Sequence, residues 1–349
     1  MDGGMERLCE EISKTLGGSP LAATTVGSLL NVYFDREYWK SISTMIAPHL
    51  KECFAYCSVF PKDYKFKRQE LVFSWMAQGH VKPGDPQMQS LEWWGDKHFD
   101  DLLSLSFFDR SHRRGRQTRD SYVMHDLIHD LADHCVVVKG CQGRISEKIR
   151  HLSWFVDSPS DLLGCNSIHI LNKCERLQTL LLECSFSENQ HSPISSLDSF
   201  LDKNVCKKLR RLRCLRLIHC PVTRLPASIS NLKHVRFLDL LWSDVQELHG
   251  NLGDLCNLQT LIIRYSPMLE RLPEQVGCLT NLRHLTIKLA ENLTELPGSL
   301  CKLTNLRHLD ISGSKILEYL PEGVIKLCNL EALILYGCDR LKNLPDRIG

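Results

Sequence analysis

The stretch SYVMHDLIHDLADH, residues 121–134, places three histidines and three aspartates within fourteen positions. His125 and His129 are four residues apart, so they would share one face of a helix. Asp126 and Asp130 form a second stripe beside them. Imidazole and carboxylate groups at this spacing are able to bind a metal ion or to exchange protons. Which of these roles applies depends on the elements that position the segment.

A metal-dependent hydrolase would need more ligands than this segment supplies. The motif H-E-x-x-H is absent, because Asp126 directly follows His125 and residue 128 is isoleucine. A second candidate, His49 with Cys53 and Cys57, has zinc-binding side chains four residues apart, but no C-x-x-C pair lies nearby. We expect no catalytic residue and no metal site. Most of the 16 cysteines are expected to be reduced and packed as small hydrophobic side chains.

Composition excludes several classes of protein. The 349-residue chain is long enough for two or three domains. Its 43 basic and 41 acidic side chains give a net charge of only +2, which is no global attraction for nucleic acid or membranes. The amino terminus has no apolar signal region, and no apolar run approaches the roughly 20 residues of a membrane span. These features predict a cytoplasmic protein without a membrane span.

A repeat runs through the second half of the chain. Leu-Pro, or Leu-His at the second place, recurs at intervals of 23, 24, 24, 24 and 24 residues, at Leu225, Leu248, Leu272, Leu296, Leu320 and Leu344. Between these lies L-x-x-L-x-x-L-x-L, as at Leu279, Leu282, Leu285 and Ile287. Its L-x-L part predicts a short strand with both apolar side chains in the core, and Leu-Pro predicts the return path on the convex side. The pattern predicts an α/β leucine-rich repeat solenoid, a horseshoe.

Residues that flank L-x-L recur in two columns, which we expect on the concave side of the solenoid. The first column contains Arg213, Arg236, Gln259, Arg283, Arg307 and Glu331, and the second contains His219, Trp242, Tyr265, Leu289, Gly313 and Gly337. Solenoids are binding surfaces, and arginine with exposed tryptophan and tyrosine is typical of interface anchors. We therefore predict protein binding through Arg213, Arg236, Trp242, Tyr265, Arg283 and Arg307. For any single position, an ordinary solvated strand residue stays an alternative.

The first half predicts three helices and a wing. Residues 49–82 contain a helix, a Phe-Pro-Lys-Asp turn and a second amphipathic helix, and residues 93–108 continue the helical pattern. A strand, a loop and a strand follow, which makes a winged-helix arrangement. Nucleic-acid binding is an alternative, because five arginines follow the third helix, at Arg110, Arg113, Arg114, Arg116 and Arg119. A solvated wing loop is favoured, because no aromatic residues are interleaved with these arginines.

The segments CFAYCSVFPKDYKF, LVFSWMAQG, DDLLSLSFF and VMHDLIHDLA together resemble the winged-helix part of plant NLR disease-resistance proteins of the coiled-coil class. Leucine-rich repeats follow, as they do in that family. The upstream GGSPLAATTVGSLL resembles the family's G-L-P-L-A segment in its nucleotide-binding (NB-ARC) module. On this resemblance the domains are 1–47, a remnant of the helical subdomain; 48–142, the winged-helix domain; and 143–349, the leucine-rich repeats.

The resemblance also implies a function. In that family the Met-His-Asp motif, here Met124, His125 and Asp126, senses bound ADP, and Pro20 would pack near the adenine. His129, Asp130 and His134 would then be helix surface. The implied function is that of an intracellular immune receptor, an ADP/ATP-controlled switch in plant defense. Its repeats would recognise a pathogen effector or a guarded host protein, and its own nucleotide-binding domain would be a further partner. A leucine-rich repeat scaffold without switch or immune function is the alternative.

Departures from the family pattern limit what this chain is expected to do. The sequence contains no G-x-x-x-x-G-K-[ST] loop and no apolar strand that ends in paired acids, so the phosphate and magnesium ligands of an ATPase are missing. Ser19 stands where the family has leucine. Residues 40–48 stand where the family has a longer stretch of helix, which indicates a deletion. We expect a fragment or truncated relative that is not an enzyme, does not hydrolyse ATP and binds nucleotide with about millimolar affinity at most.

Overall fold

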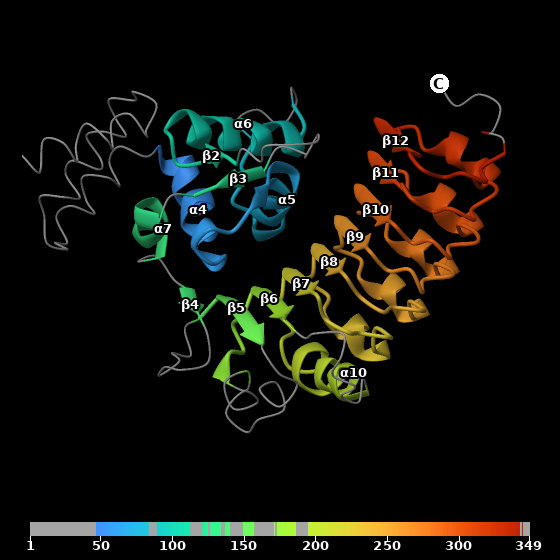
Figure 1. Cartoon of the computed structure of the whole chain (residues 1–349), viewed down its shortest axis with the longest axis horizontal. Coiled ribbons are helices and arrows are strands. Elements are labelled where there is room, and N and C mark those ends of the chain that lie inside the picture. The colour runs from blue at the N-terminus through green and yellow to red at the C-terminus, as the bar shows by residue number, and fades with distance from the viewer. Residues whose placement is uncertain are drawn as a thin grey trace, which may run out of the picture. The chain divides into compact units, whose positions relative to one another are not determined.

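The computed structural model describes residues 47–83, 89–111, 121–124, 126–133, 137–139, 149–156, 171, 173–185, 195–342 and 344. The chain divides into two compact units, Met1–Val137 and Val138–Gly349. Figure 1 shows the elements of both units. Within the described ranges, no helix has the length and apolar character needed to cross a membrane.

The first unit contains helices and a small sheet. Its helices are α4 (Pro48–Tyr56), the 3-10 helix η1 (Cys57–Val59), α5 (Arg68–Gln78), α6 (Leu91–Ser104) and α7 (Asp126–Asp133). The strands β1 (Phe66–Lys67), β2 (Asp109–Arg110) and β3 (Ser121–Val123) form an antiparallel sheet in the order β1-β3-β2. Three helices followed by two wing strands were predicted, and α4, α5, α6, β2 and β3 have this order. Strand β1, which lies between α4 and α5 and pairs with β3, was not predicted.

Local signals explain where these helices end. Ser90 is the N-cap of α6, and its hydroxyl accepts a hydrogen bond from the Trp93 backbone N–H at 3.2 Å. Helix α5 ends at Gly79, whose φ of 81° lies in the left-handed region that glycine adopts without strain. The buried rings of Phe99 and Phe108 stack with centroids 5.1 Å apart, which ties α6 to the residues that lead into β2.

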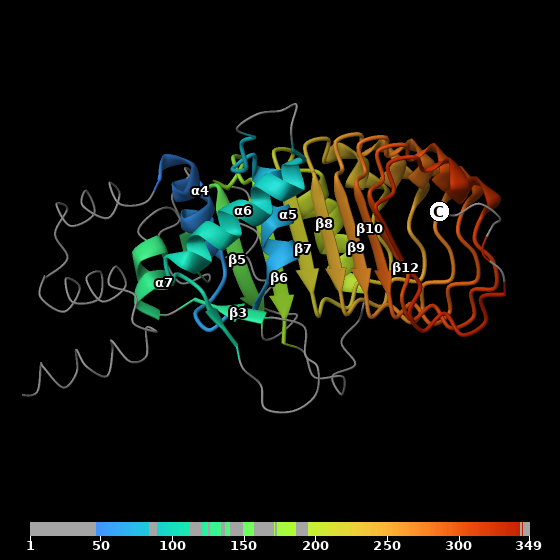
Figure 2. The same cartoon turned by 90° about the horizontal axis from the view of Figure 1, so that it is seen from above.

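The second unit is a solenoid of parallel strands (Figures 1 and 2). In the described residues its sheet runs in the order β12-β11-β10-β9-β8-β7-β6-β5-β4. The strands are β4 (Val137–Lys139), β5 (His151–Val156), β6 (Thr179–Cys184), β7 (Cys214–Ile218), β8 (Phe237–Leu241), β9 (Thr260–Arg264), β10 (His284–Lys288), β11 (His308–Asp310) and β12 (Ala332–Ile334). Helix α10 (Ser195–Phe200) and the π-helix η2 (Leu201–Cys206) lie between β6 and β7. From β5 to β12 every neighbouring pair with a described register is parallel.

The register explains why the repeat has its period. Equivalent leucines face each other across successive strands, as Leu215 does with Leu238, and Leu238 with Leu261. Their side chains are at most 1% exposed and belong to one core that continues from Ile149 to Leu327. Because each repeat buries its leucines only against its neighbours, stacking is what creates the core.

The Leu-Pro segments begin short 3-10 helices on the side of the solenoid opposite the sheet (Figure 1). Pro226, Pro273, Pro297 and Pro321 are N-caps of four of these helices. In the second repeat His249 takes this place, and its ring nitrogen accepts a hydrogen bond from Asn251 N–H at 3.1 Å. These 3-10 helices are η3 (Ala227–Asn231), η4 (Gly250–Asp254), η5 (Glu274–Cys278), η6 (Gly298–Lys302) and η7 (Glu322–Lys326).

Two side-chain ladders connect one repeat to the next. Asn257, Asn281, Asn305 and Asn329 each donate a side-chain hydrogen bond to a backbone carbonyl of the preceding repeat, at 2.7, 2.7, 2.8 and 2.7 Å. Inside the solenoid, small residues follow the strands, and the hydroxyls of Ser243 and Ser266 lie 2.9 Å apart. Both sets of hydrogen bonds give polar side chains a partner in the neighbouring repeat.

Candidate functional site: the Met-His-Asp segment and the two ends of the strands

The Met-His-Asp segment is described in part. Met124 is buried in the first unit, and Asp126 is the exposed first residue of α7. A carboxylate at this place is favoured by the positive end of the helix dipole. His125 and Pro20, the other two residues of the predicted nucleotide site, lie outside the described residues. The structure therefore describes only Asp126 of that predicted site.

The described residues of this segment do not by themselves fit ADP. Asp126 only accepts hydrogen bonds when it is ionised, and its negative charge repels a phosphate. A phosphate site needs backbone N–H groups or cationic side chains as donors. Within the described part of the Met-His-Asp segment, neither Met124 nor Asp126 supplies such a side-chain donor.

His129 does not lie on the helix surface, so that prediction was wrong. Its side chain is 1% exposed, and Nε2 lies 2.7 Å from the backbone carbonyl oxygen of Phe60. The ring N–H is therefore placed to donate to the turn after η1. Helical spacing alone could not show this, because the turn is 69 residues away in the chain. Asp130 and His134 lie outside the side chains that the structure describes.

His49, Cys53 and Cys57 do not gather around one point. The Cys57 thiol donates to the Cys53 carbonyl at 3.3 Å, whereas the His49 ring packs edge-on against His98 with centroids 4.9 Å apart. Burial raises the pKa of the Cys53 thiol, so the metal-binding thiolate is disfavoured. Across the described ranges, no group of three or more His, Cys, Asp or Glu side chains could hold a metal ion.

Of the wing arginines, only Arg110 is described, and it is exposed on β2.

The arginine column lies where the strands begin. Arg213 and Arg236 directly precede β7 and β8, and Arg283 and Arg307 directly precede β10 and β11. Backbone bonds connect the column from repeat to repeat, as when Arg236 N–H donates to the Arg213 carbonyl at 2.8 Å and Arg307 N–H to that of Arg283 at 2.8 Å. Burial, with the nearby charges of Arg236 and Arg150, lowers the pKa of the Arg213 guanidinium. The guanidinium of Arg307 pairs with Glu331 in the next repeat.

The second column lies just past the ends of the strands, and all six of its residues have positive φ. The angles are 52° at His219, 56° at Trp242, 56° at Tyr265, 55° at Leu289, 79° at Gly313 and 71° at Gly337. Positive φ is favourable for glycine and strained for bulky residues. The same turn of the backbone is thus made by glycine in two repeats and by large side chains in four.

The three rings of this column form a stack, which we call the aromatic ladder (His219, Trp242 and Tyr265). The rings of Trp242 and Tyr265 are parallel within 3°, with centroids 4.0 Å apart. His219 stacks on the other side of Trp242 at 5.7 Å. Trp242 remains 49% exposed and Tyr265 38% exposed. The ladder therefore combines strained backbone with exposed aromatic surface, a combination that clusters at functional sites.

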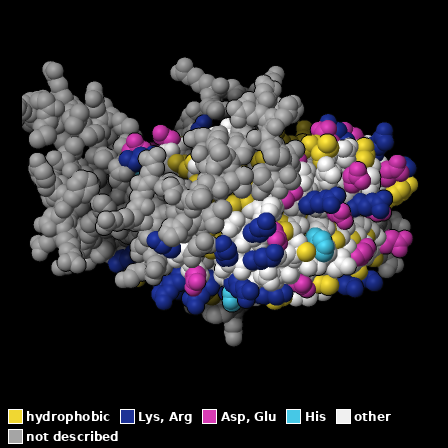
Figure 3. Space-filling view, turned by 90° about the horizontal axis from the view of Figure 1, so that it is seen from below, with side chains coloured by type: hydrophobic (Ala, Val, Ile, Leu, Met, Phe, Trp, Pro, Cys, Tyr) yellow, Lys and Arg dark blue, Asp and Glu magenta, His cyan; other side chains and the backbone are white. Residues whose placement is uncertain are grey.

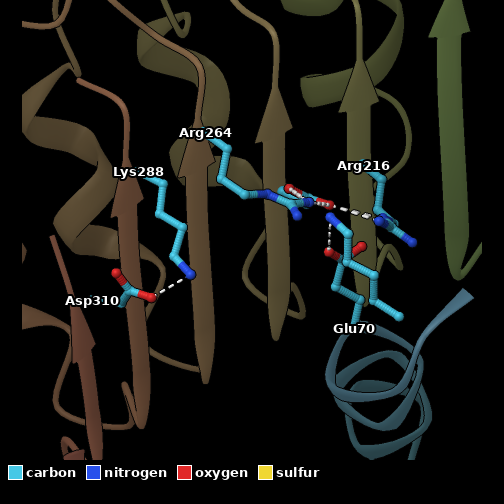
Figure 4. Close-up of polar contacts among 7 residues, drawn as sticks. Glu70, Arg216, Arg264, Lys288 and Asp310 are labelled. Carbon is cyan, nitrogen blue, oxygen red and sulfur yellow. Dashed lines mark hydrogen bonds and ion pairs between the residues drawn. The ribbon is translucent and has the colours of Figure 1, made fainter. Parts of the chain in front are cut away.

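Between the two columns lies a charged network that the sequence reasoning missed (Figure 4). The buried Asp239 carboxylate accepts from Arg216 at 3.0 and 2.8 Å and from Arg264 at 3.3 Å. Lys288 and Asp310 form a second ion pair farther along. The sequence signal for this network is the middle residue of L-x-L, as in LRL and LDL. Its side chain points to the sheet face opposite the two buried leucines.

Comparison with known proteins finds a matching family model and several similar proteins. Residues 59–132 match the family model described as the disease resistance protein winged helix domain. RPP13-like protein 1 of Arabidopsis thaliana, named as a disease resistance protein, is 30% identical over 284 residues, which are 73% of this chain and 26% of that protein. Disease resistance protein RGA2 of Solanum bulbocastanum is 29% identical over 283 residues, 74% of this chain and 25% of that protein. The leucine-rich repeat domain of the type III effector XopL aligns with 87% of this chain and 92% of its own, at 20% identity and a TM-score of 0.46.

A winged-helix region followed by a parallel-stranded leucine-rich repeat solenoid defines the class of the molecule, and the predicted fold is confirmed. The predicted resemblance is confirmed too: the chain is a homologue of plant disease resistance proteins of the coiled-coil nucleotide-binding leucine-rich repeat class. It spans about a quarter of the length of these relatives.

Proposed function

We propose that this chain is the recognition part of an intracellular plant immune receptor and that its solenoid binds a protein, either a pathogen effector or a guarded host protein. The order of winged helix and repeats, shared with disease resistance proteins, supports the immune role. The role proposed for the chain is one of binding and not of catalysis. The ADP/ATP switch, with Pro20, His125 and Asp126 at the nucleotide, would belong to the complete family module in the cytoplasm.

The aromatic ladder is the observation that carries the binding proposal. Gly313 and Gly337 make the same backbone turn without strain, so the fold does not require large side chains there. The exposed Trp242 and Tyr265 are the residue types that anchor protein interfaces. Arg213, Arg236, Arg283 and Arg307 at the other end of the strands would provide the charged contacts.

The test uses partners found by screening candidate effectors and defence proteins against the full chain. Trp242→Ala is expected to weaken binding of a true partner by about 2 kcal/mol, or about thirtyfold. Met268→Ala is the matched control, because Met268 is also 49% exposed but lies outside the ladder. The affinity is measured by calorimetric titration.

Unchanged affinity after replacing both Trp242 and Tyr265 would contradict the ladder's role. A partner with no connection to infection or defence would favour the alternative, a repeat scaffold without immune function. Micromolar ADP binding by this chain, lost in His125→Ala, would show that the nucleotide site is more complete than we propose.

A further inference from the structure

Charge is distributed unevenly along the solenoid. From Lys203 to Leu238 the sequence has ten Lys and Arg and no Asp or Glu. The ten are Lys203, Lys207, Lys208, Arg210, Arg211, Arg213, Arg216, Arg224, Lys233 and Arg236. From Asp239 to Gly349 there are eleven basic and fourteen acidic residues. Figure 3 shows one face of the chain, on which Lys and Arg gather in the middle and lower part and acidic side chains are more frequent toward the right-hand end.

The excess of positive charge is concentrated in two equivalent turns, which directly precede β7 and β8. We call them the basic turns, residues 210–213 and 233–236. Their equivalent positions hold Arg210, Arg211 and Arg213 in the first turn and Lys233, His234 and Arg236 in the second. In the next four repeats the first two of these positions are neutral, with Cys256-Asn257, Thr280-Asn281, Thr304-Asn305 and Cys328-Asn329.

The turns have the same backbone whether they are basic or neutral. Leu212 N–H donates to the Leu209 carbonyl at 3.1 Å, Val235 N–H to that of Leu232 at 3.0 Å, and Leu282 N–H to that of Leu279 at 2.8 Å. The two basic turns are neighbours, since Arg236 N–H bonds the Arg213 carbonyl at 2.8 Å. Neighbouring strands are about 4.8 Å apart, so the cations of one turn lie close to those of the other.

Cations at these positions have a structural cost. The neutral turns use their asparagine to bond the preceding repeat, as Asn281 Nδ2 does with the Cys256 carbonyl at 2.7 Å. Arg211 and His234 stand at the asparagine position and are exposed. Among the described residues, neither Arg210, Arg211 nor Lys233 forms an ion pair with a carboxylate. Like charges on adjacent strands repel each other. Exposed backbone contacts, such as that of Lys233 Nζ with the Asp254 carbonyl at 3.2 Å, need a donor but not three cations side by side.

We propose that the basic turns bind a short acidic segment of a partner protein. The inference rests on the proposed function only in that the occupant is a protein. A long polyanion such as nucleic acid would have to extend over a turn without net charge, Glu175 and Arg176, before the first basic turn, or over the net acidic repeats after the second. The basic turns also present no Trp, Tyr or Phe ring on which a base could stack. A short run of carboxylates needs neither a longer basic surface nor a ring for stacking.

The experiment measures fluorescence anisotropy of a labelled oligoglutamate peptide with the full chain at low and rising salt. The test variant is Arg210→Thr, Arg211→Asn, Lys233→Thr and His234→Asn, which installs the Thr-Asn pair of the neutral turns. It should fold at least as well, because each new asparagine can bond the preceding repeat. The control, Lys302→Thr with Lys326→Thr and Arg340→Thr, removes the same three formal charges from exposed sites in later repeats.

We expect salt-sensitive binding that falls at least tenfold in the test variant and changes little in the control. Equal binding by the test variant and the unaltered chain, or an equal loss in the control, would overturn the proposal. So would tighter binding of single-stranded DNA through the same residues. The two proposals fail separately. If the test variant still binds oligoglutamate and an identified partner, this inference fails. If Trp242→Ala abolishes binding of that partner in the same experiment, the proposed function stands.

Discussion

Repeats β7 to β9 and repeats β10 to β12 share one backbone plan but differ in what they expose. Both halves keep the leucines of L-x-L, which are buried except in the repeat of β12, and a positive φ after the strand. The earlier repeats place His219, Trp242 and Tyr265 at that angle, whereas the last two repeats place Gly313 and Gly337 there. Since glycine satisfies the geometry with no strain, the backbone turn itself does not require large side chains, which is consistent with the proposed role of these rings in binding.

The turn before each strand gives the same contrast. Later repeats use asparagine to bond the preceding repeat, as Asn305 does with the Thr280 carbonyl at 2.8 Å. The repeats of β7 and β8 have Arg211 and His234 at that position, whereas the repeat of β9 already has Asn257. Comparison within one repeat protein thus separates residues that build the solenoid from residues that it merely carries.

The largest effect is expected in the buried network of the earlier repeats. Asp239→Ala would leave the guanidinium groups of Arg216 and Arg264 without their shared carboxylate, and both are buried. The expected loss is about 3–5 kcal/mol in the free energy of unfolding, measured by urea denaturation. Asp244→Ala, at an exposed site between β8 and η4, is the control and should change little. A loss below about 1 kcal/mol at Asp239 would show that the network does not hold these repeats together.

A smaller effect is expected where the two kinds of turn differ. Asn305→Ala removes one hydrogen bond between repeats and should cost about 1 kcal/mol. His234→Asn should restore such a bond toward the Arg210 carbonyl and stabilise by a similar or smaller amount. Both are measured by denaturation under the same conditions. Destabilisation by His234→Asn would contradict the view that histidine there is a cost to the fold.

The later repeats should be more sensitive to acid. Burial, followed by the charge of His284, lowers the pKa of His308 below its ordinary value of 6.5. The folded state therefore disfavours protonation, so stability is complete above pH 6.5 and is lost as the pH falls toward the lowered pKa. Asp310 and Glu331 oppose this shift, and Lys288 adds to it. His308→Gln should flatten the decline in the melting temperature below pH 6.5; an identical decline would exclude His308 as its cause.

Much of this fold could be predicted from the sequence because repetition multiplies a weak signal. One L-x-L is ambiguous, but Leu215, Leu238 and Leu261 at constant spacing predict strands in register, as the structure shows. The winged-helix order could be predicted from helical spacing and the turn at Phe60-Pro61. The part of the site within 1–46, and His125, lie outside the described residues.

What the sequence did not reveal depends on contacts distant in the chain or on backbone angle. His129 has a surface-like spacing but bonds the Phe60 carbonyl, 69 residues away. The positive φ of Trp242 and Tyr265 has no signal in those residue types, although Gly313 and Gly337 in the same column indicate it. Asp239 lies inside L-x-L, and its partners Arg216 and Arg264 come from two other repeats, so no local pattern reveals the pairing.

The most direct test of the central claim is the free energy of unfolding of the double variant Trp242→Gly, Tyr265→Gly. The claim is that the aromatic ladder is kept for recognition and not for stability. Glycine would relieve two strained backbone positions, which offsets the lost ring stacking of about 0.5–1.5 kcal/mol. Stability within about 1 kcal/mol of the unaltered chain is therefore predicted. A loss of about 3 kcal/mol or more would mean that the ladder holds the solenoid together, and the account of it as a recognition surface would be contradicted.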